Sequence, residues 1–305
     1  MNDILRIKNL QVPEGRIDVV LDTDAYNEID DQFAISYMIR SKEKLNVKAL
    51  YAAPFHNDNS EGPCDGMKKS YDEIIKLLKL LDEEYPVFRG SESFLKDEKT
   101  PFISDAARDL AERVKAYSPE NPLYVVAIGA ITNIASAILL NPEVAENTDV
   151  VWLGGHAHHY HDTYEFNMYQ DVAAARVVMG SGVPFVQLPC FGVVSAFTVS
   201  KPELLYWLKG KNKLTDYLCE HSIEQAEIYA SPDTPWTRCI WDVTAVAWLL
   251  NDNDRFMDSR IITTRIPTYD NLYSISGKSH LMRYVYNIKR DALMTDLFEK
   301  LLLTR

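Results

Sequence analysis

The part of this chain best equipped for chemistry is a short acidic loop that follows an apolar run. Residues 22–31 read Asp-Thr-Asp-Ala-Tyr-Asn-Glu-Ile-Asp-Asp, so five carboxylates fall within ten residues. Crowding so many negative charges at one place is unfavourable unless a cation binds there. Carboxylate oxygens are hard ligands that suit Ca²⁺ or Mg²⁺ better than zinc. We therefore expect a divalent-cation site for Ca²⁺ or Mg²⁺.

Two other interpretations of the acidic loop stay open. Asp and Asn are common helix N-caps, and the helix dipole favours acids in a first turn, so one or two of these side chains could act in that way. Haloacid-dehalogenase-like phosphatases also place Asp-x-Asp after a strand, but they need Thr or Val next and basic phosphate contacts. Here Ala25 and Tyr26 follow Asp24, and no cluster of Lys or Arg lies near the loop, which disfavours a phosphatase.

The elements that position this loop follow from an alternation of apolar runs and helical periodicity. Apolar runs predict strands at 17–21, 46–53, 122–129, 149–155 and 184–189. Helical spacing predicts helices at 30–40, 65–82, 132–140 and 172–180. The later chain reads as mainly helical over 201–251, strand-like over 256–290 and helical again over 291–303.

The alternation predicts an α/β fold. We expect a single domain over residues 1–305, built on a mostly parallel open sheet with helices on both faces. In such a sheet ligands bind at the carboxyl ends of the strands. The acidic loop stands at one of those ends, so the site should form there.

The composition excludes several classes of protein. The chain has 305 residues, of which 47% are apolar and 25% charged, the usual balance of a soluble globular protein. It carries 32 Lys and Arg against 44 Asp and Glu, a net charge of −12. We therefore expect neither nucleic acid nor an anionic membrane surface as a partner. Apolar runs are shorter than the ~18 residues of a membrane-spanning helix, so we expect no membrane insertion.

The spacing of the cysteines indicates in which cellular compartment the protein is expected. The four cysteines are scattered without a Cys-x-x-Cys pair, and the N-terminus lacks the apolar stretch of a signal peptide. This pattern is typical of reduced cysteines in a cytoplasmic protein.

Four segments, in order, resemble the motifs of inosine-uridine-preferring nucleoside hydrolases. The acidic loop is similar to the family's D-T-D-P-G-x-D-D-x-x-A, and Gly-Ala-Ile-Thr-Asn-Ile-Ala at 129–135 is similar to its G-P-L-T-N-I-A. Glu165-Phe166-Asn167, with Asp171 and Ala173-Ala174, resembles E-F-N-x-x-x-D-x-x-A-A. Trp-Asp-Val-Thr-Ala-Val-Ala at 241–247 resembles H-D-P-x-A-V-A, so the matches run from residue 20 to 247.

The resemblance implies a Rossmann-like fold and hydrolysis of the N-glycosidic bond of a ribonucleoside or related N-ribosyl compound, which releases base and ribose. It implies a Ca²⁺ site formed by Asp24, Asp31, Asp242 and a backbone carbonyl that by position belongs to Ile128. Asp24 would also be the catalytic general base on water. The implied substrate-binding residues are Asp30, Asn57, Glu165, Asn167, His159 and Trp241. Relatives of this kind also imply a homo-oligomer, a dimer or a tetramer.

Two departures from the family lie close to the expected site. Residues 25–29 stand where the family has Pro-Gly-x, so the loop is two residues longer. Tyr26, Asn27 and Glu28 could reach the substrate, with Glu28 as an extra ligand or acid, or they could form a surface bulge. Trp241 stands where purine-accepting members have a His that can protonate the leaving base. Trp can stack on a flat ring but cannot serve as an acid.

A third departure is the loop at 156–161, which holds four histidines in six residues. We assign His159 to the place of a sugar-contacting Asn of the family, while a separate soft-metal site is the alternative. These departures keep a second hypothesis open, a relative that binds a sugar or nucleoside without cleaving it. The retained Asp24 argues against it, because a binding protein needs no general base.

Three further polar residues have expected structural roles. We expect Asp22 to organise the loop by accepting backbone hydrogen bonds and Asn133 to shape its turn. Asp171 should cap the helix at 172–180. Near the base we expect Tyr229, Trp236 and Arg238, together with Trp241.

Overall fold

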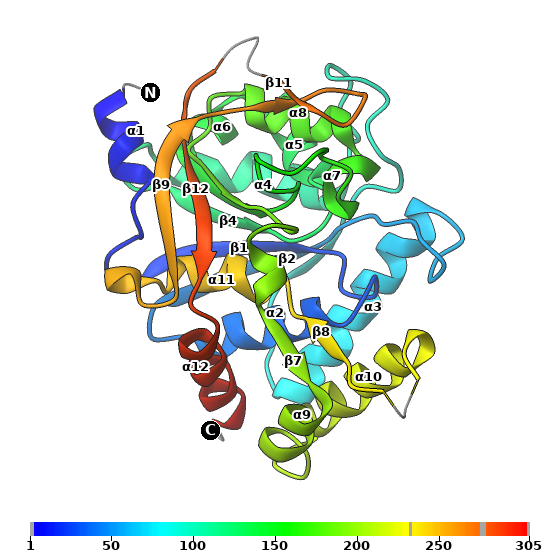
Figure 1. The fold of residues 1–305 in the computed structure, drawn as a ribbon. Helices are drawn as coiled ribbons and strands as arrows, with labels where there is room; N and C mark the ends of the chain where they lie inside the picture. The colour runs from blue at the N-terminus through cyan, green and yellow to red at the C-terminus, as the bar shows by residue number, and fades with distance from the viewer. Residues whose placement is uncertain (1–2, 232–233, 275–278, 304–305) are drawn as a thin grey trace.

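A sheet of eight strands crosses the middle of the molecule (Figure 1). The computed structural model describes residues 3–231, 234–274 and 279–303. The strand order is β3-β2-β1-β4-β5-β6-β12-β9. In that order the strands are β3 (Val87–Arg89), β2 (Leu45–Ala52), β1 (Ile17–Thr23), β4 (Leu123–Ala127), β5 (Thr148–Leu153), β6 (Phe185–Leu188), β12 (Leu281–Ile288) and β9 (Met257–Thr263). All neighbours pair in parallel except β9, which pairs antiparallel with β12 at the edge.

Helices cover both faces of this sheet because successive side chains of its strands point to opposite sides. In β1, Val19 and Leu21 join one buried apolar cluster, and Val20 joins another. The first cluster includes side chains of α2 (Asp30–Arg40), α3 (Pro63–Leu81), α11 (Val243–Leu249) and α12 (Arg290–Leu302). The second includes side chains of α4 (Asp105–Arg113), α5 (Thr132–Leu140), α6 (Glu143–Asn147) and α8 (Val172–Gly180). The predicted α/β fold is confirmed.

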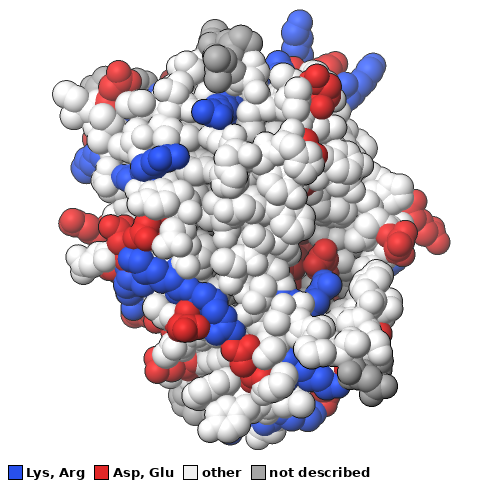
Figure 2. Space-filling model, in the orientation of Figure 1, with Lys and Arg blue, Asp and Glu red and all other residues white. Residues whose placement is uncertain are grey.

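The remaining elements are short or lie at the margin. They are α1 (Asp3–Asn9), α7 (Phe166–Gln170), α9 (Lys201–Trp207), α10 (Lys213–Tyr229), β7 (Thr198–Ser200), β8 (Thr237–Cys239), β10 (Ile266–Pro267) and β11 (Tyr273–Ser274), with 3₁₀ turns at Val114–Ala116, Val194–Ala196 and Asp252–Asp254. In the described part of the chain, no helix has the length and apolarity to cross a membrane. Acidic and basic side chains form mixed groups on the face shown in Figure 2.

The expected elements agree with the structure to within about two residues at most ends, with differences in the later chain and among the short elements. The stretch 201–251 is not uniformly helical, because β8 lies in it and pairs antiparallel with β7. A strand of three residues is too short to show a period of two. The helices α1, α4, α6 and α7 and the strands β3 and β7 were not predicted. Residues 232–233 and 275–278, which fall in the predicted helical and strand-like stretches, and the two residues at each end of the expected single domain lie outside the described residues.

Candidate active site

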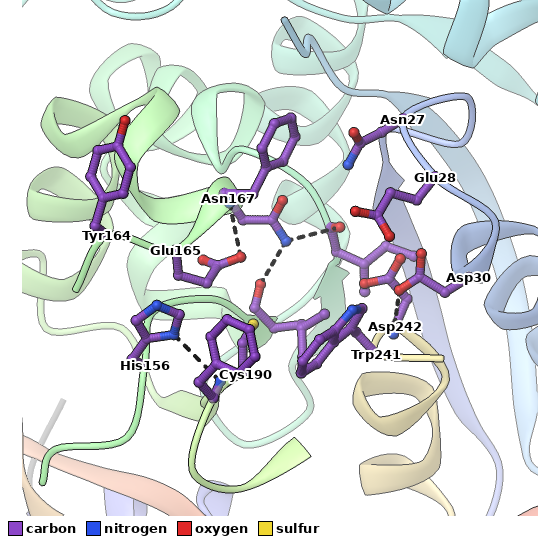
Figure 3. Close-up of a pocket in the computed structure, with 14 residues that line it drawn as sticks. Asn27, Glu28, Asp30, His156, Tyr164, Glu165, Asn167, Cys190, Trp241 and Asp242 are labelled. Atoms are coloured by element: carbon purple, nitrogen blue, oxygen red, sulfur yellow. Dashed lines mark hydrogen bonds between the residues drawn. The ribbon is translucent and has the colours of Figure 1, made fainter. Parts of the chain in front are cut away.

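A pocket with a volume of about 200 Å³ opens at the carboxyl ends of the central strands (Figure 3). Parallel strands bring the loops after β1, β4, β5 and β6 to this one edge. The pocket is lined by Asn27, Glu28, Asp30, Ile128, Leu153, His156, Tyr164, Glu165, Phe166, Asn167, Cys190, Phe191, Trp241 and Asp242. In Figure 3, Glu28, Asp30 and Asp242 lie at one side, and Glu165 lies toward His156 and Tyr164 at the other.

Three buried carboxylates come together at the acidic side. Oxygen atoms of Asp30, Asp31 and Asp242 all lie within 4.8 Å of one another. Asp30 and Asp31 open helix α2, whereas Asp242 directly precedes α11. The backbone N–H of Asp242 donates to Asp30 over 3.3 Å, which ties the two helix starts together. This group contains two of the three predicted carboxylate ligands and adds Asp30.

Asp24, the remaining predicted ligand, lies against the turn after β4. A Cβ at Gly129 would be 3.0 Å from the carboxyl carbon of Asp24, so glycine leaves room for this carboxylate. Both of its oxygens are buried and have no hydrogen-bond partner. Burial raises the pKa of Asp24 well above its usual range, and the charges of Asp31 and Asp30 raise it further.

The other acids have similar electrostatics. Burial raises the pKa of Asp31 to about 7, although a hydrogen bond from the Thr23 hydroxyl opposes the shift. Its second oxygen is also buried without a partner. Burial raises the pKa of Asp242 well above its usual range, and the charges of Asp30, Asp31 and Asp24 add to the effect. Buried carboxylate oxygens without partners are costly, so these donors fit a hard divalent cation.

The backbone carbonyl of Ile128 is held by the predicted substrate residue Asn167. The amide of Asn167 donates to the carbonyl of Ile128 over 3.2 Å and to that of Leu153 over 3.0 Å. Asn167 lies in the first turn of α7 and is 5% exposed. It therefore joins the ends of β4 and β5 beneath the pocket.

Glu165 lines the pocket, but its carboxylate has a structural task. It accepts three backbone hydrogen bonds, from Gly155 over 2.8 Å and from Asn167 and Met168 over 3.0 Å each. It thus caps α7 and ties it to the loop after β5. The Cys190 thiol is a further hydrogen-bond partner. Burial raises the pKa of Glu165, while the backbone donors act in the opposite direction.

Histidine placement differs from the expectation. His159 is exposed and does not line the pocket, whereas the buried His156 does. The His156 ring packs against Tyr160 and Phe191, with centroids 4.7 Å and 5.1 Å away. Phe191 in turn meets Trp241 edge to face at 5.5 Å. The sequence alone could not rank four neighbouring histidines, because their directions depend on the packing of the loop.

The lengthened loop reaches the pocket and is not a surface bulge. Asn27 and Glu28 line the pocket, and Tyr26 is exposed. Asn57 does not line the pocket, and its amide donates to the side-chain oxygen of Asn27 over 2.6 Å. Glu28 forms an ion pair with Arg238 of β8 at 2.9 Å. Asn57 is therefore placed to position the loop rather than to touch a ligand in this pocket.

The three structural expectations have mixed outcomes. Asp171 caps α8, accepting from the backbone of Ala174 over 2.9 Å, as predicted. Asp22 accepts from the side chain of Asn133 over 2.7 Å, so the prediction of backbone donors was wrong. Asn133 also accepts from the backbone of Ser91, which agrees with its expected structural role.

Residues that sequence reasoning missed supply the apolar wall of the pocket. They are Leu153, His156, Tyr164, Phe166, Cys190 and Phe191. Leu153 lies in the predicted strand at 149–155 and Phe166 in the quoted Glu-Phe-Asn motif, while the others lie in loops after predicted strands, and nothing else in the sequence marked them. Of the aromatic residues expected near the base, Trp241 lines the pocket, but Tyr229 and Trp236 do not.

The structure is thus an α/β protein with a parallel sheet, and buried carboxylates that could hold a metal ion lie beside an aromatic pocket at the carboxyl edge of that sheet. The chain belongs to the family described as inosine-uridine preferring nucleoside hydrolase, whose model matches residues 19–291. This match confirms the resemblance found in the sequence motifs.

Individual relatives agree with the family. A probable uridine nucleosidase of Arabidopsis thaliana is 27% identical over 135 residues, which is 43% of this chain and 41% of that protein. The match thus spans about two fifths of that curated relative's length. A plant nucleoside hydrolase structure superposes with a TM-score of 0.73 at 20% identity, covering 96% of this chain and 100% of the other. A purine-preferring ribonucleoside hydrolase from Gardnerella vaginalis gives 0.73 at 18% identity, with 93% and 98% covered. At these identities the structures show a shared fold.

Proposed function

We propose that this protein hydrolyses the N-glycosidic bond of a ribonucleoside or related N-ribosyl compound in a Ca²⁺-dependent reaction. The observation that carries the proposal is the pair of buried, unpartnered oxygens of Asp24 beside a pocket lined by carboxylates and aromatic rings. Family membership supports it.

Asp24, Asp31, Asp242 and the Ile128 carbonyl would hold the ion, with Asp30 adjoining them. The buried, unpartnered oxygens of Asp24 and Asp31, and the grouping of Asp31 with Asp30 and Asp242, fit such an ion. The chemistry that a divalent ion supplies when bound is to lower the pKa of a neighbouring water. Mg²⁺ is the alternative because the ligand types suit both ions.

The chain's own residues account for the remaining steps. Asp24 takes a proton from the attacking water as that oxygen forms its bond to the anomeric carbon. The bond between this carbon and the base nitrogen breaks through an oxocarbenium-like state, whose positive charge the surrounding carboxylates stabilise. Asp30 and Asn167 lie in the pocket where sugar hydroxyls would bind. In this proposal Trp241 stacks on the base, and His156 takes the place assigned to His159 in the pocket wall.

The test is release of ribose from a panel of inosine, uridine, cytidine and adenosine, with Ca²⁺ or with a chelator. Chelator-sensitive release that disappears in Asp24→Asn supports the proposal. Calcium binding, measured by calorimetry, provides a readout independent of turnover. No release from any nucleoside while Ca²⁺ still binds would replace the hydrolase with the second hypothesis, a protein that binds without cleaving.

Two further expectations belong to this proposal. We infer a homo-oligomer, which light scattering after size-exclusion chromatography tests. We also infer a cytoplasmic location, with which the four free cysteines agree, because thiols stay reduced in that compartment.

A further inference from the structure

We propose that a cavity at the β9 edge of the sheet binds a phosphate-type dianion through Arg260, Arg265 and His158. The cavity has a volume of about 350 Å³. Its lining consists of His158, Arg260, Ile262, Thr263, Thr264 and Arg265. It shares no lining residue with the pocket described above, although His156 of that pocket lies on the same loop as His158. Binding at this cavity is therefore independent of the proposed hydrolysis.

The cavity lies at the margin of the main sheet, where β9 runs antiparallel beside β12 (Figure 1). Arg260 of β9 pairs with Tyr284 of β12, so the two side chains stand on the same face of the sheet. The ring of His158 packs on Tyr284 with centroids 4.5 Å apart, and the backbone N–H of His158 donates to the Tyr284 hydroxyl over 3.1 Å. Arg265 follows the end of β9. The fold thus brings nitrogen-bearing side chains from two distant segments to one cavity.

The protein does not neutralise the two arginines of the cavity. Among the described residues, no Asp or Glu lines the cavity or forms an ion pair with Arg260 or Arg265. Arg176 and Arg238, by contrast, each pair with an acid, at 2.6 Å and 2.9 Å. The guanidinium of Arg260 lies 5.9 Å from the ring centroid of Tyr284 instead. In a chain with 44 acids and 32 basic residues, two arginines that face one cavity without an acid leave an uncompensated positive charge.

The charges of both arginines reach the same neighbouring groups. The pKa of His158 is lowered to about 4, first by burial and then by the charges of Arg265 and Arg260. Burial raises the pKa of Tyr284, and the charges of the same two arginines act against that shift. The two guanidinium groups therefore act together on one place. Guanidinium groups match the oxygens of phosphate bidentately, so a dianion fits between them.

His158 has one ring nitrogen available to a ligand. Its Nε2 lies 3.1 Å from the side-chain oxygen of Gln187, whose amide donates to the Gly154 carbonyl over 3.0 Å and to the Tyr273 hydroxyl over 2.7 Å. Since both amide hydrogens of Gln187 are used, its oxygen accepts from the Nε2–H of His158. In the described part of the chain, Nδ1 of His158 forms no hydrogen bond. A proton on Nδ1 would add a third positively charged donor to the cavity.

A bound dianion should raise the pKa of His158, because its charge offsets those of the two arginines. The other titratable groups around the ring are Tyr273, Tyr284 and His159, none of which carries a negative charge near pH 7. The occupied protein therefore binds more protons than the free protein as the pH falls. By linkage, the affinity for a dianion of constant charge should rise as the pH falls.

The experiment titrates sulfate into the full chain in chelator, at constant ionic strength, and follows the histidine ring resonances by NMR. Sulfate is the probe because, unlike phosphate, it keeps its double charge between about pH 5 and about pH 8. We expect one saturable site with a Kd of about 1 mM or tighter, and about tenfold tighter binding at pH 5 than at pH 8. The His158 resonances, assigned by their loss in His158→Gln, should shift with occupancy. Absence of saturable binding overturns the inference.

Substitutions locate the bound sulfate. Arg260→Gln and Arg265→Gln should each weaken binding about tenfold or more. His158→Gln retains a donor but cannot take up a proton, so it should abolish the extra affinity at low pH. The matched control is Arg108→Gln, since Arg108 is an exposed arginine of α4. Equal affinity in Arg260→Gln and Arg108→Gln would overturn the assignment.

Thermal unfolding shows whether each variant is folded. Arg260 is exposed and Arg265 is half-buried, so Arg260→Gln keeps the test decisive if Arg265→Gln does not fold. A pH-independent affinity in the wild-type protein would remove His158 from the site.

Free phosphate and a phosphoryl group on a small molecule share this chemistry, and competition separates them. Inorganic phosphate and ribose 5-phosphate are each titrated against bound sulfate at about pH 7.5, where most phosphate is doubly charged. Displacement by both with similar affinity identifies a site for the free anion. At least about tenfold tighter binding of ribose 5-phosphate identifies a phosphorylated ligand, for which the cavity volume leaves room. Failure of both to displace sulfate overturns the phosphate class.

Discussion

The side-chain amide of Asn167 donates a hydrogen bond to the carbonyl oxygen of Ile128 over 3.2 Å. Ile128 directly follows β4, and Asn167 lies in α7. A side chain from a distant segment therefore orients the carbonyl that is proposed to bind the ion. Partners that orient a metal ligand in this way commonly change metal affinity by about 10- to 100-fold when they are removed.

Asn167→Ala should therefore weaken Ca²⁺ binding about tenfold. It should also destabilise the fold by about 1–3 kcal/mol, because two buried carbonyls lose a donor. Calorimetric titration and denaturant unfolding measure the two effects. The control is Asn57→Ala, since Asn57 bonds to Asn27 outside the carboxylate cluster. Unchanged Ca²⁺ affinity in Asn167→Ala would contradict the assignment of the Ile128 carbonyl.

Removal of the ion should lower the stability of the folded protein, because the buried carboxylates then repel one another without a cation between them. Saturation with Ca²⁺ at about 100 times its Kd should stabilise the wild-type protein by about 2.7 kcal/mol relative to protein in chelator. Asp24→Asn should lose most of this gain, and its ribose release should fall by roughly 10²- to 10⁴-fold. Thermal unfolding with and without Ca²⁺ measures the first effect. A full Ca²⁺ gain in the variant would remove Asp24 from the ion site.

Substitution of His156 and of His159 should have different effects on kcat/KM. His156→Ala removes a ring that packs against Tyr160 and Phe191 in the pocket wall. We expect kcat/KM to fall about tenfold, a loss of roughly 1.4 kcal/mol. His159 is exposed, so His159→Ala should stay within about twofold of wild type. The reverse order would restore the assignment of His159 made from the sequence.

Asp149 should make stability depend on pH. Burial raises the pKa of Asp149 well above its ordinary value in the folded protein. The unfolded chain therefore releases this proton first, and stability falls as pH rises toward the folded-state pKa. Asp149→Asn keeps an acceptor for Asn9, which donates to Asp149 over 3.3 Å, but removes the titration.

Relative to wild type, Asp149→Asn should gain roughly 1 kcal/mol or more in the free energy of unfolding between about pH 4 and pH 7.5. Urea unfolding in chelator at several pH values checks this. Asp291→Asn is the control, because that side chain is 92% exposed and should show little such gain. A constant difference between Asp149→Asn and wild type would mean that Asp149 is not perturbed.

The sequence by itself determined the alternation of strands and helices, the acidic loop, the Asp171 cap and the family. These features depend on residues close together in the chain, because strand and helix periods and caps are local patterns. The parallel-sheet rule then placed the loops at one edge without any coordinates. This is why Asp30 and Asn167 could be predicted to lie at the same edge, whereas Trp241 and Asp242 were placed there by the family resemblance alone.

Only the tertiary structure decided what each loop side chain touches. Asn57 bonds to Asn27, Glu165 caps α7, and Glu28 pairs with Arg238, a residue 210 positions away. His156 rather than His159 enters the pocket wall because loop packing sets the direction of each ring. These partners depend on which distant segments of the chain meet and on which backbone groups there need hydrogen bonds. Neither of these two conditions produces a repeating pattern in the sequence.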